Sequence, residues 1–212
     1  YTLTFPFEFR SIQAFYPILF QNDANGNPYP VALFGFQEGE NLFLDESGWD
    51  ARYVPAMMRR EPFLIGYQGS EEQEDDDKPR VLSIDMDHPR ISETEGEALF
   101  LPHGGTSDFM TSMTRTLEDI QYGHQMNEEF VDALLEFDLI ESVAMEVELN
   151  NGAKRQLLGL YTINEDRLEQ LDGEALSKLH SKHHLLSIYM ILASLSSFRT
   201  LIDKMNDRLP ED

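Results

Sequence analysis

The chain has 212 residues, of which 41% are hydrophobic, so it is long and apolar enough to fold around a core. Its 39 acidic residues outnumber the 16 basic ones, and the net charge of -23 excludes nucleic-acid binding through a basic face. The chain contains no cysteine, which excludes disulfides, thiolate catalysis and iron–sulfur clusters.

The first part of the chain predicts a short helix followed by a small antiparallel meander. Apolar residues at helical spacing favour a helix over residues 8–15. Strands are predicted over 16–20, 29–36 and 41–44, with turn-forming residues between them. The segment 49–60 has helical spacing but contains an internal proline, so we expect a broken helix, or an entry turn that ends near Pro55.

The middle of the chain predicts a second pair of strands and a long helix. Strands over 63–67 and 81–85 flank an acidic insertion at residues 70–79, which should be a solvated loop because like charges cannot pack together. Residues 107–138 carry apolar side chains at spacings of three and four, which predicts a long helix. Gly123 is a point at which this helix could break in two.

A hairpin is the clearest local signal in the sequence. Val143–Leu149 alternates between apolar and polar residues, Asn150–Gly152 is a strong turn sequence, and Arg155–Ile163 returns as the partner strand. The outward face carries Glu146 and Glu148, and the inward face is apolar.

The C-terminal part of the chain predicts helices. Asn164 should cap a short helix, and a long apolar helix is expected over 174–208. Residues 185–195 are apolar on most sides, which favours burial in the centre of the domain or in a homodimer interface. Together the elements predict a single α+β domain over 1–212. We expect an antiparallel sheet of about six or seven strands, with a long central helix and an apolar C-terminal helix packed on it.

Asp85, Asp87 and His88 form a candidate metal site at the end of a predicted strand. Alternate residues on a strand face the same side, so the two carboxylates could bind one divalent cation. This interpretation would support a metal-assisted enzyme. The alternative is a turn at the end of the strand, held by the aspartate side chains.

Two further motifs have weaker support. His180, His183 and His184 have spacings that suit zinc, but the glutamate of a metalloprotease helix is missing, so a polar helix surface is favoured. Residues 103–106 could present backbone N–H groups to an anion. Because no lysine follows them as in a phosphate loop, a plain turn is favoured, and no cofactor is expected.

The arginines near the only tryptophan form a candidate ligand site, because positive charge is scarce in this chain. The candidate residues are Trp49, Arg52, Tyr53, Arg59 and Arg60. Arginine binds carboxylate and phosphate groups bidentately, and tryptophan is a common interface anchor. We expect them to line a groove beside the sheet that holds a peptide or an acidic group. The alternative is that these arginines pair with carboxylates of the chain itself.

Three segments together resemble the SapC family of S-layer-related transport proteins. The segments are Phe15–Phe20 with Pro30–Gly35; Glu40–Phe43 with Trp49–Pro55 and Arg60–Phe63; and Leu158–Tyr161 with Leu168 and the apolar C-terminal helix. The resemblance spans roughly residues 8 to 205 and brings no catalytic residues. It implies an accessory role in export or surface assembly, with a protein or peptide of a transport or modification system as the partner.

The leading hypothesis is therefore a non-enzymatic binding or interaction protein that works with a transport, secretion or surface-assembly system. The alternatives are a metal-assisted enzyme centred on Asp85, Asp87 and His88, or a small-ligand-sensing regulatory domain. The sequence has no uninterrupted apolar run of the ~20 residues that cross a bilayer, so stable membrane insertion is not expected. A cytoplasmic location is expected, with the periplasm as the alternative.

Overall fold

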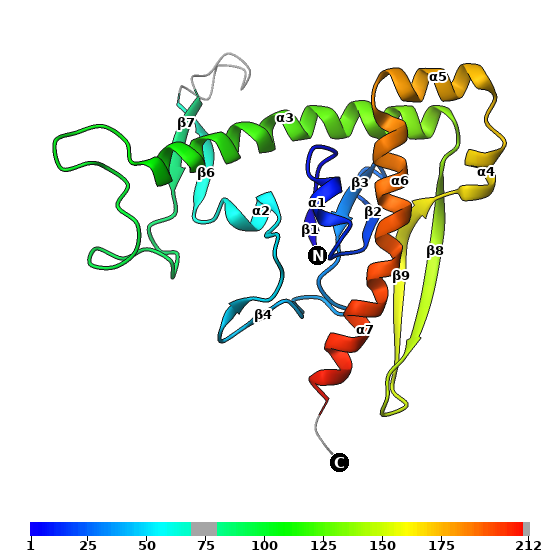
Figure 1. Cartoon of the computed structure of the whole chain (residues 1–212), viewed down its shortest axis with the longest axis horizontal. Helices are drawn as coiled ribbons and strands as arrows, with labels where there is room; N and C mark the ends of the chain where they lie inside the picture. Colours follow the sequence, from blue (N-terminus) through cyan, green and yellow to red (C-terminus); the bar gives the residue numbers. More distant parts are fainter. Residues whose placement is uncertain (69–79, 210–212) are drawn as a thin grey trace. The chain divides into compact units, whose positions relative to one another are not determined.

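The computed structural model describes residues 1–68 and 80–209 (Figure 1), and these fall into two compact units. The larger unit is Tyr1–Pro55 with Gly123–Asp212, and the smaller unit is Ala56–Tyr122. The contacts within the chain divide it at these points, and the prediction of a single domain over 1–212 stays a prediction. The acidic insertion at 70–79 lies outside the described residues.

The larger unit combines a sheet with helices, which confirms the α+β class. Its strands are β1 (Thr2–Leu3), β2 (Ile18–Asn22), β3 (Pro28–Ala32), β4 (Leu44–Asp45), β5 (Gly48–Trp49), β8 (Ile140–Glu148) and β9 (Lys154–Ile163). Its helices are α1 (Phe9–Ile12), α4 (Glu165–Glu169), α5 (Gly173–Ser181), α6 (His184–Ser194), the short 3-10 helix η2 (Leu195–Ser197) and α7 (Phe198–Asp207). Helix α3 (Asp108–Glu136) continues into this unit from Gly123 onward.

The main sheet has five antiparallel strands in the order β1-β3-β2-β9-β8. Strands β2 and β3 pair along their whole length, and the expected β8–β9 hairpin is confirmed. Its turn closes where the Leu149 N–H donates to the carbonyl of Ala153 over 2.8 Å. Strands β2 and β9 pair at a single position, Phe20 with Tyr161, so the sheet opens beyond that point.

The expectation of six or seven strands in this sheet is too high, because residues 33–44 do not extend it. The Phe36 N–H donates over 2.6 Å to the carboxylate of Glu40, so the chain turns back on a side chain instead of forming a ladder. The short strands β4 and β5 pair only with each other. The predicted broken helix over 49–60 is a strand end at Trp49 followed, after Pro55, by the short helix α2 (Ala56–Arg59).

The core of the larger unit is aromatic and aliphatic. Its fully buried side chains include Phe5, Phe9, Ile12, Tyr16, Phe20, Phe130, Leu134, Ile188 and Ile191. Helix α6 packs on the sheet, and the Ser194 hydroxyl accepts a 2.8 Å bond from the Ile18 N–H of β2. A buried serine therefore satisfies a strand donor that water cannot reach.

The C-terminal helix is broken where one helix over 174–208 was expected. His183 adopts a left-handed conformation with φ 62° between α5 and α6, and η2 separates α6 from α7. The run His184–Asp207 is long and apolar enough to span a membrane by length and composition. In this structure 33% of its apolar 18-residue window is buried within the protein, and Ile191 and Leu201 on the run are fully buried.

Gly123 does not break α3, contrary to one expectation from the sequence. A Cβ at this position would lie 2.6 Å from the Phe5 ring, so glycine is needed for close packing. Asn127 lies one turn later and donates from its amide over 2.9 Å to the Thr4 carbonyl. The N-terminal segment is therefore bound directly to this part of the helix.

The smaller unit contains α2, the hairpin of β6 (Phe63–Tyr67) and β7 (Arg80–Ile84), and the first half of α3. Its core consists of Phe63, Met110, Met113 and Leu117, with partly buried side chains of the hairpin packed against them. The predicted strands over 63–67 and 81–85 are confirmed, and they form a sheet of their own.

Candidate functional site

A bulge in strand β9 shapes the candidate site. The pairing between β8 and β9 shifts register between Val143 and Met145. As a result two residues of β9, Leu158 and Gly159, stand opposite one residue of β8. Gly159 has φ 72°, a left-handed conformation that glycine adopts without steric cost. A glycine inside this strand therefore marks the bulge.

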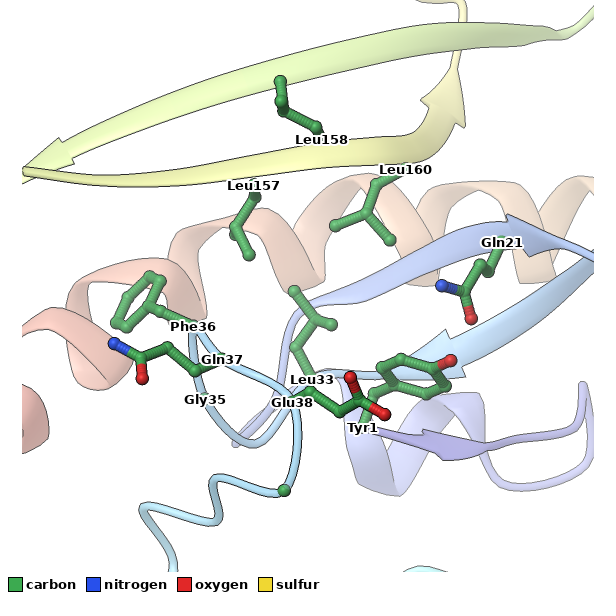
Figure 2. Close-up of a pocket in the computed structure, with 11 residues that line it drawn as sticks. Tyr1, Gln21, Leu33, Gly35, Phe36, Gln37, Glu38, Leu157, Leu158 and Leu160 are labelled. Carbon is green, nitrogen blue, oxygen red and sulfur yellow. The ribbon is translucent and has the colours of Figure 1, made fainter.

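The bulge places two leucines on the same side of the strand. In a regular strand Leu157 and Leu160, three residues apart, would face opposite sides of the sheet. Figure 2 shows both pointing into one hollow, whereas Leu158 points away from it. Leu158 is 67% exposed, while Leu160 is buried. The extra residue thus creates an apolar wall that a regular strand would lack.

The opposite wall is the turn over residues 33–39. The Leu42 N–H donates over 2.8 Å to the Phe34 carbonyl, and the Glu40 carboxylate accepts from the Phe36 N–H. Gly35 leaves room for this carboxylate, because a Cβ there would lie 2.6 Å from its oxygen. The turn is therefore held in place by Glu40, a residue of the segment that resembles the SapC family.

Between these walls lies a cavity of about 480 Å³ (Figure 2). It is lined by Tyr1, Gln21, Leu33, Gly35, Phe36, Gln37, Glu38, Gly39, Leu157, Leu158 and Leu160. The buried side chains of Leu33, Phe36 and Leu160 provide an apolar lining, while exposed Gln37 and Glu38 add polar groups. An apolar hollow with a few polar groups is typical of ligand sites in proteins.

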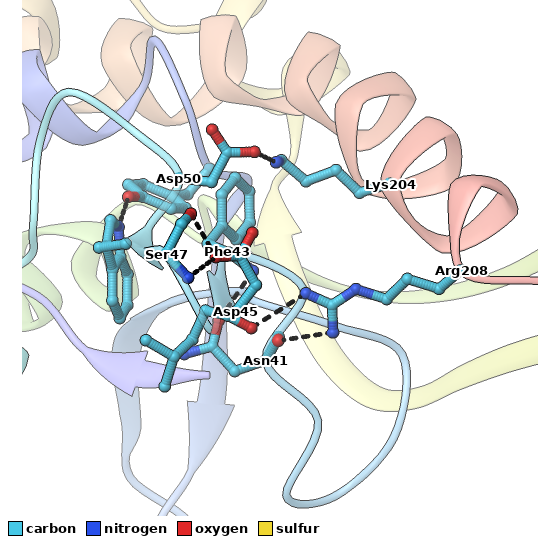
Figure 3. Close-up of polar contacts among 10 residues, drawn as sticks. Asn41, Phe43, Asp45, Ser47, Asp50, Lys204 and Arg208 are labelled. Carbon is cyan, nitrogen blue, oxygen red and sulfur yellow. Dashed lines mark hydrogen bonds and ion pairs between the residues drawn. The ribbon is translucent and has the colours of Figure 1, made fainter.

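Helix α7 holds the segment that follows this turn (Figure 3). The Arg208 guanidinium donates to the carbonyl oxygens of Asn41 and Leu44, each over 3.1 Å. Lys204 pairs with the Asp50 carboxylate, and its ammonium lies 5.0 Å from the centre of the Phe43 ring. The C-terminal helix therefore supports the segment that resembles the SapC family.

Asp45 lies in the same group of contacts (Figure 3). Its carboxylate accepts bonds from the Ser47 hydroxyl and the Ser47 N–H. These bonds, with a smaller contribution from the Arg208 charge, lower the pKa of Asp45 below its usual value. Asp45 therefore serves the turn between β4 and β5.

Trp49 and Tyr53, two of the predicted ligand contacts, take part in an internal hydrogen-bond chain. The Trp49 indole donates over 2.7 Å to the Tyr16 hydroxyl, which donates over 2.5 Å to the Tyr53 carbonyl. The Tyr53 hydroxyl in turn donates over 2.8 Å to the buried carboxylate of Glu8. Burial raises the pKa of Tyr16 to about 12. Trp49 also packs edge-on against Phe34, with ring centres 5.2 Å apart, and so supports the turn beside the cavity.

The predicted arginines belong to two different compact units. Arg52 belongs to the larger unit and is exposed, whereas Arg59 and Arg60 belong to the smaller unit. The Arg60 guanidinium donates over 2.9 Å to the Phe63 carbonyl, so it serves the start of β6. None of the five predicted residues lines the cavity described above.

The candidate metal residues make local contacts. Asp85 accepts a 3.1 Å bond from the Asp87 N–H, and His88 accepts one from the Arg90 N–H over 3.2 Å. The other ring nitrogen of His88 lies 3.7 Å from a Glu61 oxygen. Over residues 1–68 and 80–209, no group of three or more His, Asp or Glu side chains is arranged to hold a metal ion. These contacts match the alternative of a turn at the end of the strand.

The three C-terminal histidines are also separated. His180 and His183 are exposed, whereas His184 is buried against Phe130, with ring centres 5.5 Å apart. Burial lowers the pKa of His184, and the nearby Lys182 adds to the effect. The turn over 103–106 closes on itself, because the Gly104 N–H donates to the Leu101 carbonyl over 3.0 Å.

The sequence interpretation missed the cavity, although two signals for it are present. Residues 157 and 158 are consecutive leucines, which breaks the alternation of the strand, and Gly159 follows them directly. A glycine inside a strand is a known sign of a bulge or of close backbone approach. The contribution of residues 33–36 had no comparable signal, because they were interpreted as the end of a strand, with Gly39 marking the turn after it.

The comparisons with known proteins agree with the resemblance noted from the sequence. The family model described as SapC matches residues 1–201 of the chain, so the chain belongs to the SapC family. No curated protein and no solved structure matches it.

Proposed function

We propose that this SapC-family chain is a non-enzymatic binding protein that is accessory to a transport, secretion or surface-assembly system. We place its ligand in the cavity between β9 and residues 33–39. The observation that carries the proposal is the combination of a buried apolar lining with adjacent polar groups in about 480 Å³. This volume lies within the range of roughly 300–1,000 Å³ found for ligand pockets.

The lining favours a ligand with an apolar part and a hydrogen-bonding or cationic part. The leucines and Phe36 would remove an apolar group from water, which stabilises binding by roughly 25 cal/mol per Å² buried. Glu38 supplies the one carboxylate in the lining, and the whole chain carries a net charge of -23. Both features favour a cationic ligand through electrostatic complementarity.

The chemistry of the lining supports binding over catalysis. Among the lining residues there is no histidine, serine or lysine, so the common activated nucleophiles are missing, and the ionisable side chains are the Glu38 carboxylate and the Tyr1 phenol. The metal-assisted enzyme centred on Asp85, Asp87 and His88 has no comparable support, since the Asp85 and His88 side chains accept bonds from nearby backbone N–H groups and His88 also lies against Glu61.

Two surfaces outside the cavity remain proposed partner contacts. Arg52 is exposed, and it could contact an acidic group of a partner protein. On α6, Leu186 and Tyr189 are exposed three residues apart, which suits a homodimer through the C-terminal helix. Light scattering of wild type and Leu186→Glu would test the dimer. A cytoplasmic location also remains part of the proposal.

The test of the cavity uses n-octylamine, which combines an alkyl chain with an ammonium group. Saturation-transfer NMR should detect binding to the wild type and no binding to Leu157→Arg, whose side chain fills the hollow. Leu135→Arg is the matched control, because Leu135 is an exposed leucine on α3 that does not line the cavity. Equal binding to all three proteins, or to none, would contradict the proposed site.

A further inference from the structure

Strand β9 has an edge that is only partly used. Its pairing with β8 extends from Lys154 to Ile163, but on the other side it pairs with β2 only at Tyr161. Within the described residues, the stretch Lys154–Leu160 therefore has no strand partner on that side. An unpaired edge presents a row of N–H and C=O groups that can accept another strand.

The cavity adjoins this open edge. Leu157 and Leu160 of the edge line the hollow, and Gln21 of the diverging strand β2 lines it from the other side (Figure 2). In an extended peptide, alternate side chains face the same way, so a strand added here would direct every second residue toward the apolar lining. Gly159 has no side chain, which permits another backbone to approach closely.

We propose that β9 binds an extended, cationic peptide segment of a partner protein by strand addition, with its apolar residues in the cavity. This inference rests on the proposed function and specifies the class of ligand. Charge complementarity with the cavity favours a cationic occupant: Glu38 lies in the lining, the Lys154 ammonium at the start of the edge is paired with Glu146, and the protein has 39 acidic against 16 basic residues. A segment in which lysine alternates with leucine meets both requirements.

The length of the open edge sets the length of the peptide. At about 3.3 Å per residue, a peptide of about seven residues would cover Lys154–Leu160. Backbone hydrogen bonds would provide affinity, and the cavity would select the apolar side chains. The outer edge of β8 also has no strand partner among residues 1–68 and 80–209, but its exposed Glu141, Glu146 and Glu148 do not form an apolar lining.

The experiment uses fluorescein-labelled peptides of about seven residues with alternating lysine and leucine, followed by fluorescence anisotropy. Two further peptides carry N-methyl groups on the odd or on the even residues. In a strand, N–H groups on alternate residues point to the same edge, so only one of the two sets can bind β9. We expect one N-methylated peptide to bind about tenfold or more weakly and the other to stay within about threefold of the parent.

Three protein variants complete the design. Leu157→Arg should abolish peptide binding, the milder Leu157→Ser should weaken it, and Leu135→Arg, on an exposed position of α3 outside the cavity and the edge, should leave it unchanged. The fluorescence of Trp49, the only tryptophan, shows in each case whether the variant is folded. Amide hydrogen exchange of the complex should show new protection within Lys154–Leu160.

The outcomes separate the two proposals. If octylamine binds to the cavity but the parent peptide does not, or if both N-methylated peptides bind like the parent, strand addition is wrong and the cavity site stands. If the parent peptide binds equally to Leu157→Arg and to wild type, and octylamine does too, the cavity itself is wrong.

Discussion

Tyr16→Phe is the substitution for which the structure predicts the clearest effect on stability. The Tyr16 side chain is fully buried, and its ring contacts Phe34, Phe43 and Trp49. Phenylalanine keeps these ring contacts and removes only the hydroxyl. That hydroxyl accepts from the Trp49 indole and donates to the Tyr53 carbonyl. Any loss of stability therefore reports on the two hydrogen bonds.

The magnitude follows from these bonds. Each contributes about 1 kcal/mol net, and a partner left without a bond costs about 1–3 kcal/mol when it is buried. Trp49 and Tyr53 are half-buried, so water can replace part of what is lost. We expect the free energy of unfolding to fall by about 2–3 kcal/mol, which is roughly a 30- to 140-fold change in the unfolding equilibrium constant.

Urea denaturation followed by the fluorescence of Trp49 measures this change in the free energy of unfolding directly. The chain has one tryptophan, and it lies beside the substitution. Tyr122→Phe is the matched control: Tyr122 is 63% exposed, and its substitution should change the free energy by less than about 0.5 kcal/mol. A Tyr16→Phe protein as stable as the control would refute the role assigned to the hydrogen-bond chain.

Three other substitutions test the remaining features. Gly159→Ala should lower the free energy of unfolding in urea by about 1–2 kcal/mol because its φ is 72°, whereas Gly173→Ala should not. The pKa of His184 is lowered from 6.5, so the unfolded chain takes up the proton first and stability falls as pH drops below 6.5. His184→Leu should flatten that slope in thermal melts at pH 5 to 7. Arg208→Met should speed hydrogen exchange at residues 41–45, while Arg199→Met, an exposed control, should not.

Local patterns predicted the parts of this fold that depend on local contacts. The turn at Asn150–Gly152 closes the β8–β9 hairpin as expected. Asn164 caps α4 by accepting a 2.8 Å bond from the Arg167 N–H. Each signal involves residues within a few positions of one another, so no knowledge of the tertiary fold is needed to interpret it.

The errors arose where distant residues decide the conformation. Gly123 looked like a helix breaker, but the Phe5 ring occupies the space beside it. Residues 33–36 looked like the continuation of a strand, but the carboxylate of Glu40 captures the Phe36 N–H. Neither contact can be derived from the periodicity of the segment itself.

The candidate site shows the same difference between features set by local patterns and features set by distant residues. Trp49 was chosen as a ligand anchor because it is a single large aromatic residue near arginines, yet its indole N–H is bound to Tyr16. The cavity depends on one extra residue in β9, which brings Leu157 and Leu160 to the same side. The glycine that permits this was visible in the sequence, but the diverging strand β2 and the turn at 33–39 were not.

The most direct test of the account is an NMR titration of the uniformly ¹⁵N-labelled protein with n-octylamine. The account predicts that the shifting amides cluster in Leu33–Glu38 and Leu157–Leu160, the two walls of the cavity. Shifts that cluster around Arg52 instead would contradict the account. So would the absence of any shift at the highest soluble concentration of n-octylamine.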